Sequence, residues 1–342
     1  RTASYNFSYF DYATPINQSI EKRYINRHRL EKKNPNAKVS EPVEPIIYYV
    51  DRGAPEPIRS ALIEGASWWN QAFEAAGYKN GFQVKVLPEG ADPLDLRYNV
   101  IQWVHRSTRG WSYGASISDP RTGEILKGHV SLGSLRIRQD FLIASALKAQ
   151  YKNGNDNDNE ALQLALARIR QLAAHEVGHT LGFTHNFAAS VNNRASVMDY
   201  PHPYITIKDG KLDFSQAYET GIGEWDKVAV TYSYASYSKN EEAQLIKGIE
   251  NAEQKGLKFL SDSDARPISG ASPLAHLWDN GTSATAELKR LLNVRNIAIQ
   301  NFSMDNIKSG QPYSDLEDVF VPLYFLHRYQ AEATVKLIGG LD

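Results

Sequence analysis

The segment HEVGHTLGFTHNF, residues 175–187, contains three of the nine histidines in a chain of 342 residues. His175 and His179 are four residues apart, so on a helix of ~100° per residue they lie within ~40° of each other on one face. Two imidazole nitrogens at that spacing can bind one zinc ion. Glu176 lies one step round the helix, where its carboxylate reaches a water on the metal more readily than the metal itself. The HExxH pattern therefore predicts two zinc ligands and a general base.

The third histidine of the segment cannot lie on the same helix face. Six further residues would carry His185 ~600° round the axis, which is ~240° away from the ligand face, and ~9 Å along it. The helix must therefore end between His179 and His185 if all three bind one metal. Gly182 stands at that point, and glycine adopts the left-handed conformation that ends helices without steric cost. The full pattern, HExxHxxGxxH, fixes five positions and favours a metal site over three unrelated surface histidines.

Composition excludes several other classes of protein. Apolar residues make up 42% and charged residues 23% of the chain, and the formal net charge is -1, which gives no reason to expect nucleic acid as a partner. The sequence contains no run of about 18 apolar residues, so it does not predict a transmembrane helix. Because there is no cysteine, disulfides and thiolate ligands are excluded, while the compartment stays open. The chain begins at Arg1 without a secretory hydrophobic segment, so we expect a processed product or part of something longer.

Periodicity predicts strands before the histidine segment and helices after it. An amphipathic helix over residues 58–76 ends at Gly77, and residues 111–133 form a hairpin whose turn contains Pro120 and Gly123. The polar loop 152–160 carries Asp and Asn side chains that suit calcium, but it lacks EF-hand spacing, which favours a solvated loop. Other strands are predicted at 45–51, 82–88 and 98–105, and other helices at 134–151, 160–182, 224–234, 241–256, 284–300 and 314–333.

This order of elements, ending in HExxHxxGxxH, resembles the metzincin clan of zinc peptidases over residues 45–235. Met198, in the turn SVMDY thirteen residues after His185, resembles the methionine of the clan's Met-turn. The resemblance implies an α+β fold. Its expected parts are a mixed, mostly parallel twisted sheet with an antiparallel edge strand, an active-site helix, a Met-turn and a mostly helical C-terminal part. We expect an N-terminal extension over 1–44, a catalytic domain over 45–239 and a helical region over 240–342.

A narrower resemblance concerns large bacterial zinc-dependent metalloproteases that are catalogued as domains of unknown function. DPRTGEILKGHVSLGS (119–134) and the histidine segment together resemble their catalytic region. This implies a bacterial protein in an extracytoplasmic location, whether periplasmic, outer-membrane-associated or secreted. Asn186, which follows the third histidine, differs from the residues that mark the well-known subfamilies, so neither subfamily nor specificity follows from the resemblance. The sequence leaves the oligomeric state open.

These observations predict a zinc-dependent endopeptidase that acts on protein or peptide substrates. A water activated by the metal attacks the scissile carbonyl while Glu176 takes its proton. One alternative is a gluzincin-like peptidase with a downstream glutamate such as Glu219 as third ligand. Another is a non-catalytic binding or scaffold protein with structural zinc, but such a site has no use for Glu176 and normally fills all four positions with protein ligands.

The resemblance also implies two further parts of the site. Tyr200 follows Met198 by two residues, an offset at which a tyrosine of astacin- and serralysin-type enzymes reaches the zinc and can donate to the developing oxyanion. The strand at about 111–118 is expected at the sheet edge, where extended substrate pairs with it, because small residues there admit another backbone. Its substrate-binding residues would be Trp111, Ser112, Tyr113, Gly114 and Ala115. Five of the other six histidines are expected to be structural: His105, His129, His202, His276 and His327. His202 is the nearest of them to the chemistry because it lies by the Met-turn.

Overall fold

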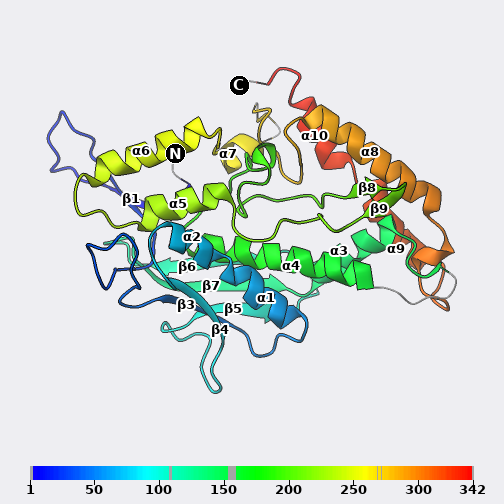
Figure 1. The fold of residues 1–342 in the computed structure, drawn as a ribbon, viewed down its shortest axis with the longest axis horizontal. Coiled ribbons are helices and arrows are strands. Elements are labelled where there is room, and N and C mark those ends of the chain that lie inside the picture. The colour runs from blue at the N-terminus through cyan, green and yellow to red at the C-terminus, as the bar shows by residue number, and fades with distance from the viewer. Residues whose placement is uncertain (1–2, 108–109, 153–158, 268, 271, 341–342) are drawn as a thin grey trace.

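A five-stranded sheet forms the lower layer of the molecule in Figure 1. The computed structural model describes residues 3–107, 110–152, 159–267, 269–270 and 272–340. The strand order is β4-β3-β5-β7-β6; all neighbours are parallel except β6, which is antiparallel to β7 at the edge. This confirms the predicted mixed sheet with an antiparallel edge strand. The strands are β3 (Ile46–Val50), β4 (Phe82–Val86), β5 (Asn99–Val104), β6 (Tyr113–Ser118) and β7 (Ile125–Gly133).

Three helices cover one face of this sheet, and α4 (Asn159–Thr180) is the longest of them. It packs against β6, β7 and α1 (Ile58–Ser67), and its C-terminal residues 171–180 are all buried. The helix predicted over 58–76 is two helices, because Trp68 N–H donates to Gly65 O and tightens the turn before α2 (Trp69–Ala75). Gly65 also lets the two backbones cross closely, since a Cβ there would lie 2.0 Å from Arg170 O.

The C-terminal part is mostly helical, as predicted. The single helix expected over 314–333 is wrong: α9 (Asp315–Tyr324) contains Pro322, which has no N–H to donate, and the chain turns before α10 (Arg328–Val335). The break lets α9 pack on α3 while α10 packs on α8. The remaining helices are α3 (Leu135–Leu147), α5 (Glu224–Tyr234), α6 (Glu241–Gln254), the short α7 (Asp262–Ala265), α8 (Ala284–Asn301), and the 3-10 turns η2 (Ser190–Asn192) and η3 (Met304–Asn306).

Two small antiparallel hairpins complete the fold. The sequence suggests strands in the N-terminal extension, which forms β1 (Asn6–Phe10) and β2 (Glu21–Ile25). It does not predict β8 (Thr206–Lys208) and β9 (Lys211–Asp213), although Asp209 and Gly210 between them both have positive φ, as a two-residue hairpin turn requires.

The N-terminal extension lies against the end of α4. Tyr5 N–H donates to Gly182 O, and Thr184 N–H donates to Ala3 O. The domain boundaries at 44 and 239 stay predictions. Most of the polar loop considered for calcium, residues 153–158, lies outside the described residues. Among the described helices, none combines the length and apolar character needed to cross a membrane.

Candidate metal centre

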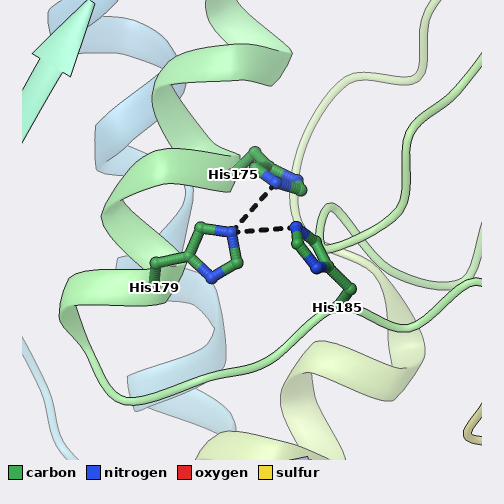
Figure 2. A group of neighbouring side chains, drawn as sticks. All are labelled: His175, His179 and His185. Carbon is green, nitrogen blue, oxygen red and sulfur yellow. Dashed lines mark hydrogen bonds between the residues drawn. The ribbon is translucent and has the colours of Figure 1, made fainter. Parts of the chain in front are cut away.

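The last turns of α4 place His175 and His179 one above the other in a buried position. Their Nε2 atoms are 3.2 Å apart, and the nitrogens of the three rings point toward one another (Figure 2). His179 Nε2 also lies 3.2 Å from His185 Nε2. Among the described residues, these three side chains form the one group of three or more His, Cys, Asp or Glu whose ligand atoms lie close enough together to hold a metal.

His185 reaches this group because α4 ends in a tight turn. Gly182 N–H donates to His179 O and Phe183 N–H to Gly178 O, which closes the helix. Gly182 has a φ of +103°, and a Cβ there would lie 2.1 Å from Asn26 O. The position therefore needs glycine both for its backbone conformation and for the close approach of the N-terminal extension.

The other nitrogen of each imidazole is held by an oxygen. The Nδ1 atoms of His175, His179 and His185 lie 2.8 Å from Val197 O, Phe183 O and Asp262 Oδ2, respectively. Carbonyl and carboxylate oxygens only accept, so the proton is on Nδ1 and each Nε2 turns a lone pair toward the common centre. Zinc–nitrogen bonds of 2.0–2.1 Å in a tetrahedral site separate the ligands by about 3.4 Å, so the histidines fit zinc.

Burial keeps two of these imidazoles neutral, which is the form that binds metals. Burial, followed by the neighbouring His179 and His185, lowers the pKa of His175 well below its ordinary value. Burial and the nearby His185 also lower the pKa of His179 to about 4.

Met198 is buried against the HExxH segment. Gly178, inside the HExxH segment, makes room for it, since a Cβ at Gly178 would lie 2.2 Å from Met198 Sδ. The turn itself is fixed by Asp226 of α5, whose carboxylate accepts from Ser196 Oγ at 2.5 Å and from Val197 N at 2.8 Å. Neither Gly178 nor Asp226 is among the site residues predicted from the sequence.

Glu176 lies beside the histidines with 5% of its surface exposed. Burial raises the pKa of Glu176 to about 8, against the opposing effects of Arg168 and of a hydrogen bond from Gly114 N–H. Gly114 belongs to β6, which crosses directly over α4: a Cβ there would lie 2.1 Å from Glu176 O. The small residue in β6 therefore admits the helix, rather than the substrate backbone considered from the sequence.

Tyr200 packs on two of the three imidazoles. Its ring centroid lies 5.3 Å from that of His175 and 4.8 Å from that of His185. Arg266 Nη2 donates to the Tyr200 hydroxyl at 3.1 Å. Arg266 also pairs with Asp262, the carboxylate that holds His185. Burial would raise the pKa of Asp262, but hydrogen bonds from His185 and Arg266 hold it below its usual range.

Several residues of this centre come from distant segments that the sequence analysis did not connect with it. Asn186 is buried; its side chain accepts from Leu260 N and donates to Lys258 O, which holds the segment leading to Asp262. The sequence around Asp262 does carry a local signal of a helix start. It is SDSDA, residues 261–265, in which Ser261 and Asp264 cap the short helix α7. Tyr5, from the N-terminal extension, places its hydroxyl 3.4 Å from His179 Nδ1, and nothing in the sequence indicates this.

Other candidate residues lie away from the histidines. Glu219 forms an ion pair of 3.6 Å with Arg194, so the structure does not bring it to the metal group. Trp111 and Ser112 precede β6, and Trp111 is 61% exposed. The six other histidines also lie outside the group that can hold a metal: His28, His105, His129, His202, His276 and His327.

A buried HExxH helix, a third histidine beyond a glycine turn and a supporting methionine turn define the class of zinc metallopeptidases. A family model described as Met-zincin matches residues 157–342, more than half of the chain, and the protein belongs to that family. The match begins just before α4 and includes the helical C-terminal region. Comparisons with curated proteins and with solved structures give no significant match.

Proposed function

We propose that this protein is a zinc endopeptidase in which His175, His179 and His185 hold the metal. The observation that carries the proposal is the convergence of three Nε2 lone pairs, each fixed through its Nδ1, beside the buried carboxylate of Glu176. Zinc bound there supplies a Lewis acid for the scissile carbonyl and lowers the pKa of a water. A scaffold with structural zinc has no use for a buried base next to its ligands.

Glu176 moves the protons of the reaction. Its carboxylate takes a proton from the water as the water oxygen bonds to the carbonyl carbon, and it gives that proton to the amine nitrogen as the C–N bond breaks. The hydrogen bond from Gly114 N–H orients the carboxylate, and β6 covers it from bulk water. The strand that binds substrate in this proposal therefore also positions the base.

Tyr200 stabilises the carbonyl oxygen as negative charge develops on it. A guanidinium only donates, so the Tyr200 oxygen accepts from Arg266 and keeps its own proton available for the substrate. The ring packs on His175 and His185, which places the phenol beside the metal ligands.

We expect Tyr200→Phe to lower kcat by between tenfold and a hundredfold while zinc content and Tm stay unchanged. The substitution keeps the ring that packs on the histidines and removes only the hydroxyl. A donor to such an oxyanion contributes roughly 3 kcal/mol, or about a hundredfold in rate. Steady-state kinetics on a fluorogenic peptide measures the effect, and an unchanged kcat would leave Tyr200 as a packing residue.

The edge strand β6 supports binding of an extended peptide. It is the last strand of the sheet, and its alternating burial turns Tyr113 and Ile117 outward while Gly114 faces α4. A peptide strand added there gains main-chain hydrogen bonds, and pockets for alternate side chains give specificity. We expect a peptidomimetic inhibitor to lie along Tyr113–Ser116 in a co-crystal structure; an inhibitor bound without contacts to this stretch contradicts the role.

The proposed activity is tested by metal removal. Cleavage of an unfolded protein such as casein should stop with 1,10-phenanthroline and return when about one equivalent of zinc per chain is restored. Fragment mass spectrometry separates internal cuts from removal of terminal residues. Continued cleavage by the zinc-free protein would refute the proposal.

The bacterial resemblance supports an extracytoplasmic location for this peptidase. Fractionation of the source cells, with immunodetection of the chain, tests the location independently of the activity.

A further inference from the structure

Two buried carboxylates, one in the Met-turn and one before α8, line the same cavity. Asp199 directly follows Met198, and Asp279 lies in the connection before α8. The two segments run side by side, because Trp278 N–H donates to Tyr200 O at 2.9 Å and Asn280 Nδ2 donates to His202 O at 2.8 Å. Two segments about eighty residues apart in sequence therefore bring their acids together.

No cationic side chain balances these two acids. Among the described residues, no Lys, Arg or His nitrogen lies within ion-pair distance of Asp199 or Asp279. Burial, followed by the nearby Asp279, raises the pKa of Asp199 well above its usual range. Lys336 acts on Asp279 only from a distance, since its ammonium group donates to Ala265 O and Ala275 O.

Two oxygens at this place also lack a hydrogen-bond donor. Within the part of the chain that the structure describes, Asp279 Oδ1 and Asn280 Oδ1 are buried without a hydrogen-bond partner, in residues that are 6% and 3% exposed. The Asn280 amide cannot be turned round to correct this, because its Nδ2 is already fixed on His202 O. Both residues, together with Asp199 and Ser190, line a cavity of about 350 Å³.

We propose that Asp199, Asp279 and the Asn280 side-chain oxygen bind a hard divalent cation of the calcium type. Calcium takes six to eight oxygen ligands. Its calcium–oxygen distances of about 2.3–2.6 Å are shorter than the donor–acceptor distance of a hydrogen bond. A cation therefore satisfies oxygens for which the described residues offer no donor, and the cavity has room for waters that complete its coordination. The donors are oxygens, without the imidazole or thiolate that zinc and copper prefer.

The cation fastens the Met-turn to the segment that precedes α8. Trp278, directly before Asp279, has a φ of +61°, which is costly for a residue with a bulky side chain. This conformation lets the indole pack on Tyr200, with ring centroids 5.1 Å apart, while Asp279 and Asn280 turn toward Asp199. A cation that holds both acids stabilises this strained connection.

The test uses the whole chain, with calcium as the probe. Protein equilibrated with 1 mM calcium and gel-filtered should carry about one calcium per chain beside its zinc, measured by mass spectrometry of metals. Removing calcium should lower Tm by about 5 °C, as expected for a ligand present at about a hundred times its Kd. Terbium in place of calcium should give luminescence sensitised by the adjacent Trp278.

Asp279→Asn distinguishes the cation from a shared proton. If a cation binds, the variant loses calcium and the terbium signal, keeps zinc, and its Tm no longer responds to calcium. If the two acids share a proton instead, the wild type binds no calcium and the variant is equally or more stable, which overturns the proposal. Glu219→Gln is the matched control, because Glu219 lines the same cavity but pairs with Arg194 and should keep the calcium response.

Discussion

Replacing Glu176 with glutamine should lower peptidase turnover by about three orders of magnitude while zinc stays near one per chain. General acid–base groups contribute roughly 10²–10⁴-fold, and glutamine keeps the size of the side chain while losing its ability to take a proton. The three histidines that hold the metal are untouched by the change. Turnover of a fluorogenic peptide and metal analysis of the same sample measure both quantities.

The control for this variant is Glu64→Gln on α1. Glu64 pairs with Arg170 of the same helix that carries Glu176, but it is half exposed and distant from the histidines. This control should retain wild-type turnover. A Glu176→Gln enzyme within tenfold of wild type would remove the glutamate from the mechanism.

His185→Ala should weaken zinc binding by roughly 10²–10³-fold and abolish measurable cleavage at submicromolar free zinc. Structural zinc sites bind with about 10–16 kcal/mol over four ligands, so each ligand contributes several kcal/mol. Asp262→Asn should fall between this variant and wild type, because residues that orient a ligand typically affect metal affinity by about 10–100-fold. Competition with a chromophoric chelator measures the three zinc Kd values.

The order of these three zinc affinities decides whether His185 or a downstream glutamate is the third zinc ligand. His327→Ala removes a histidine far from the centre, at the start of α10, and should bind zinc as wild type does. Retained zinc in His185→Ala, lost on further substitution of Glu219, would instead support the gluzincin-like arrangement. The ion pair of Glu219 with Arg194 makes that outcome unexpected.

The sequence predicts the elements of this fold where one periodic pattern decides them. The strands of the sheet and the helix that carries HExxH are confirmed, because their apolar runs and helical spacing are regular. The antiparallel edge strand, which the family resemblance implies, is confirmed as well. The helix over 314–333 is wrong because the apolar pattern continues through a turn, and only packing on α3 and α8 shows where the chain changes direction. The dipeptide Asp209–Gly210 is a local hairpin signal, and it forms the turn between β8 and β9.

Only the part of the metal centre that lies in the HExxHxxGxxH motif could be predicted from the sequence. The spacing of His175, His179 and His185 follows from helix geometry and one glycine. Asp262 and Arg266 lie in a connection that has no periodicity, so nothing local assigns them to a site. Gly114 illustrates the same limit: its small size was evident from the sequence, but the reason for it, the crossing of β6 over α4, appears only when the two elements pack.

The hydrogen bond between Asp262 and His185 has a consequence for how the chain acquires its metal. The two residues are 77 positions apart, and the contact of Tyr5 with His179 spans 174. An unfolded or nascent chain can offer zinc the three histidines of residues 175–185, but His185 gains its orienting carboxylate only when Asp262 has folded against it. High-affinity capture is thus delayed until long loops have closed, which is the slow part of folding for non-local contacts. Zinc uptake in real time would then follow the completion of tertiary structure, and a partly folded chain would leave the ion in solution.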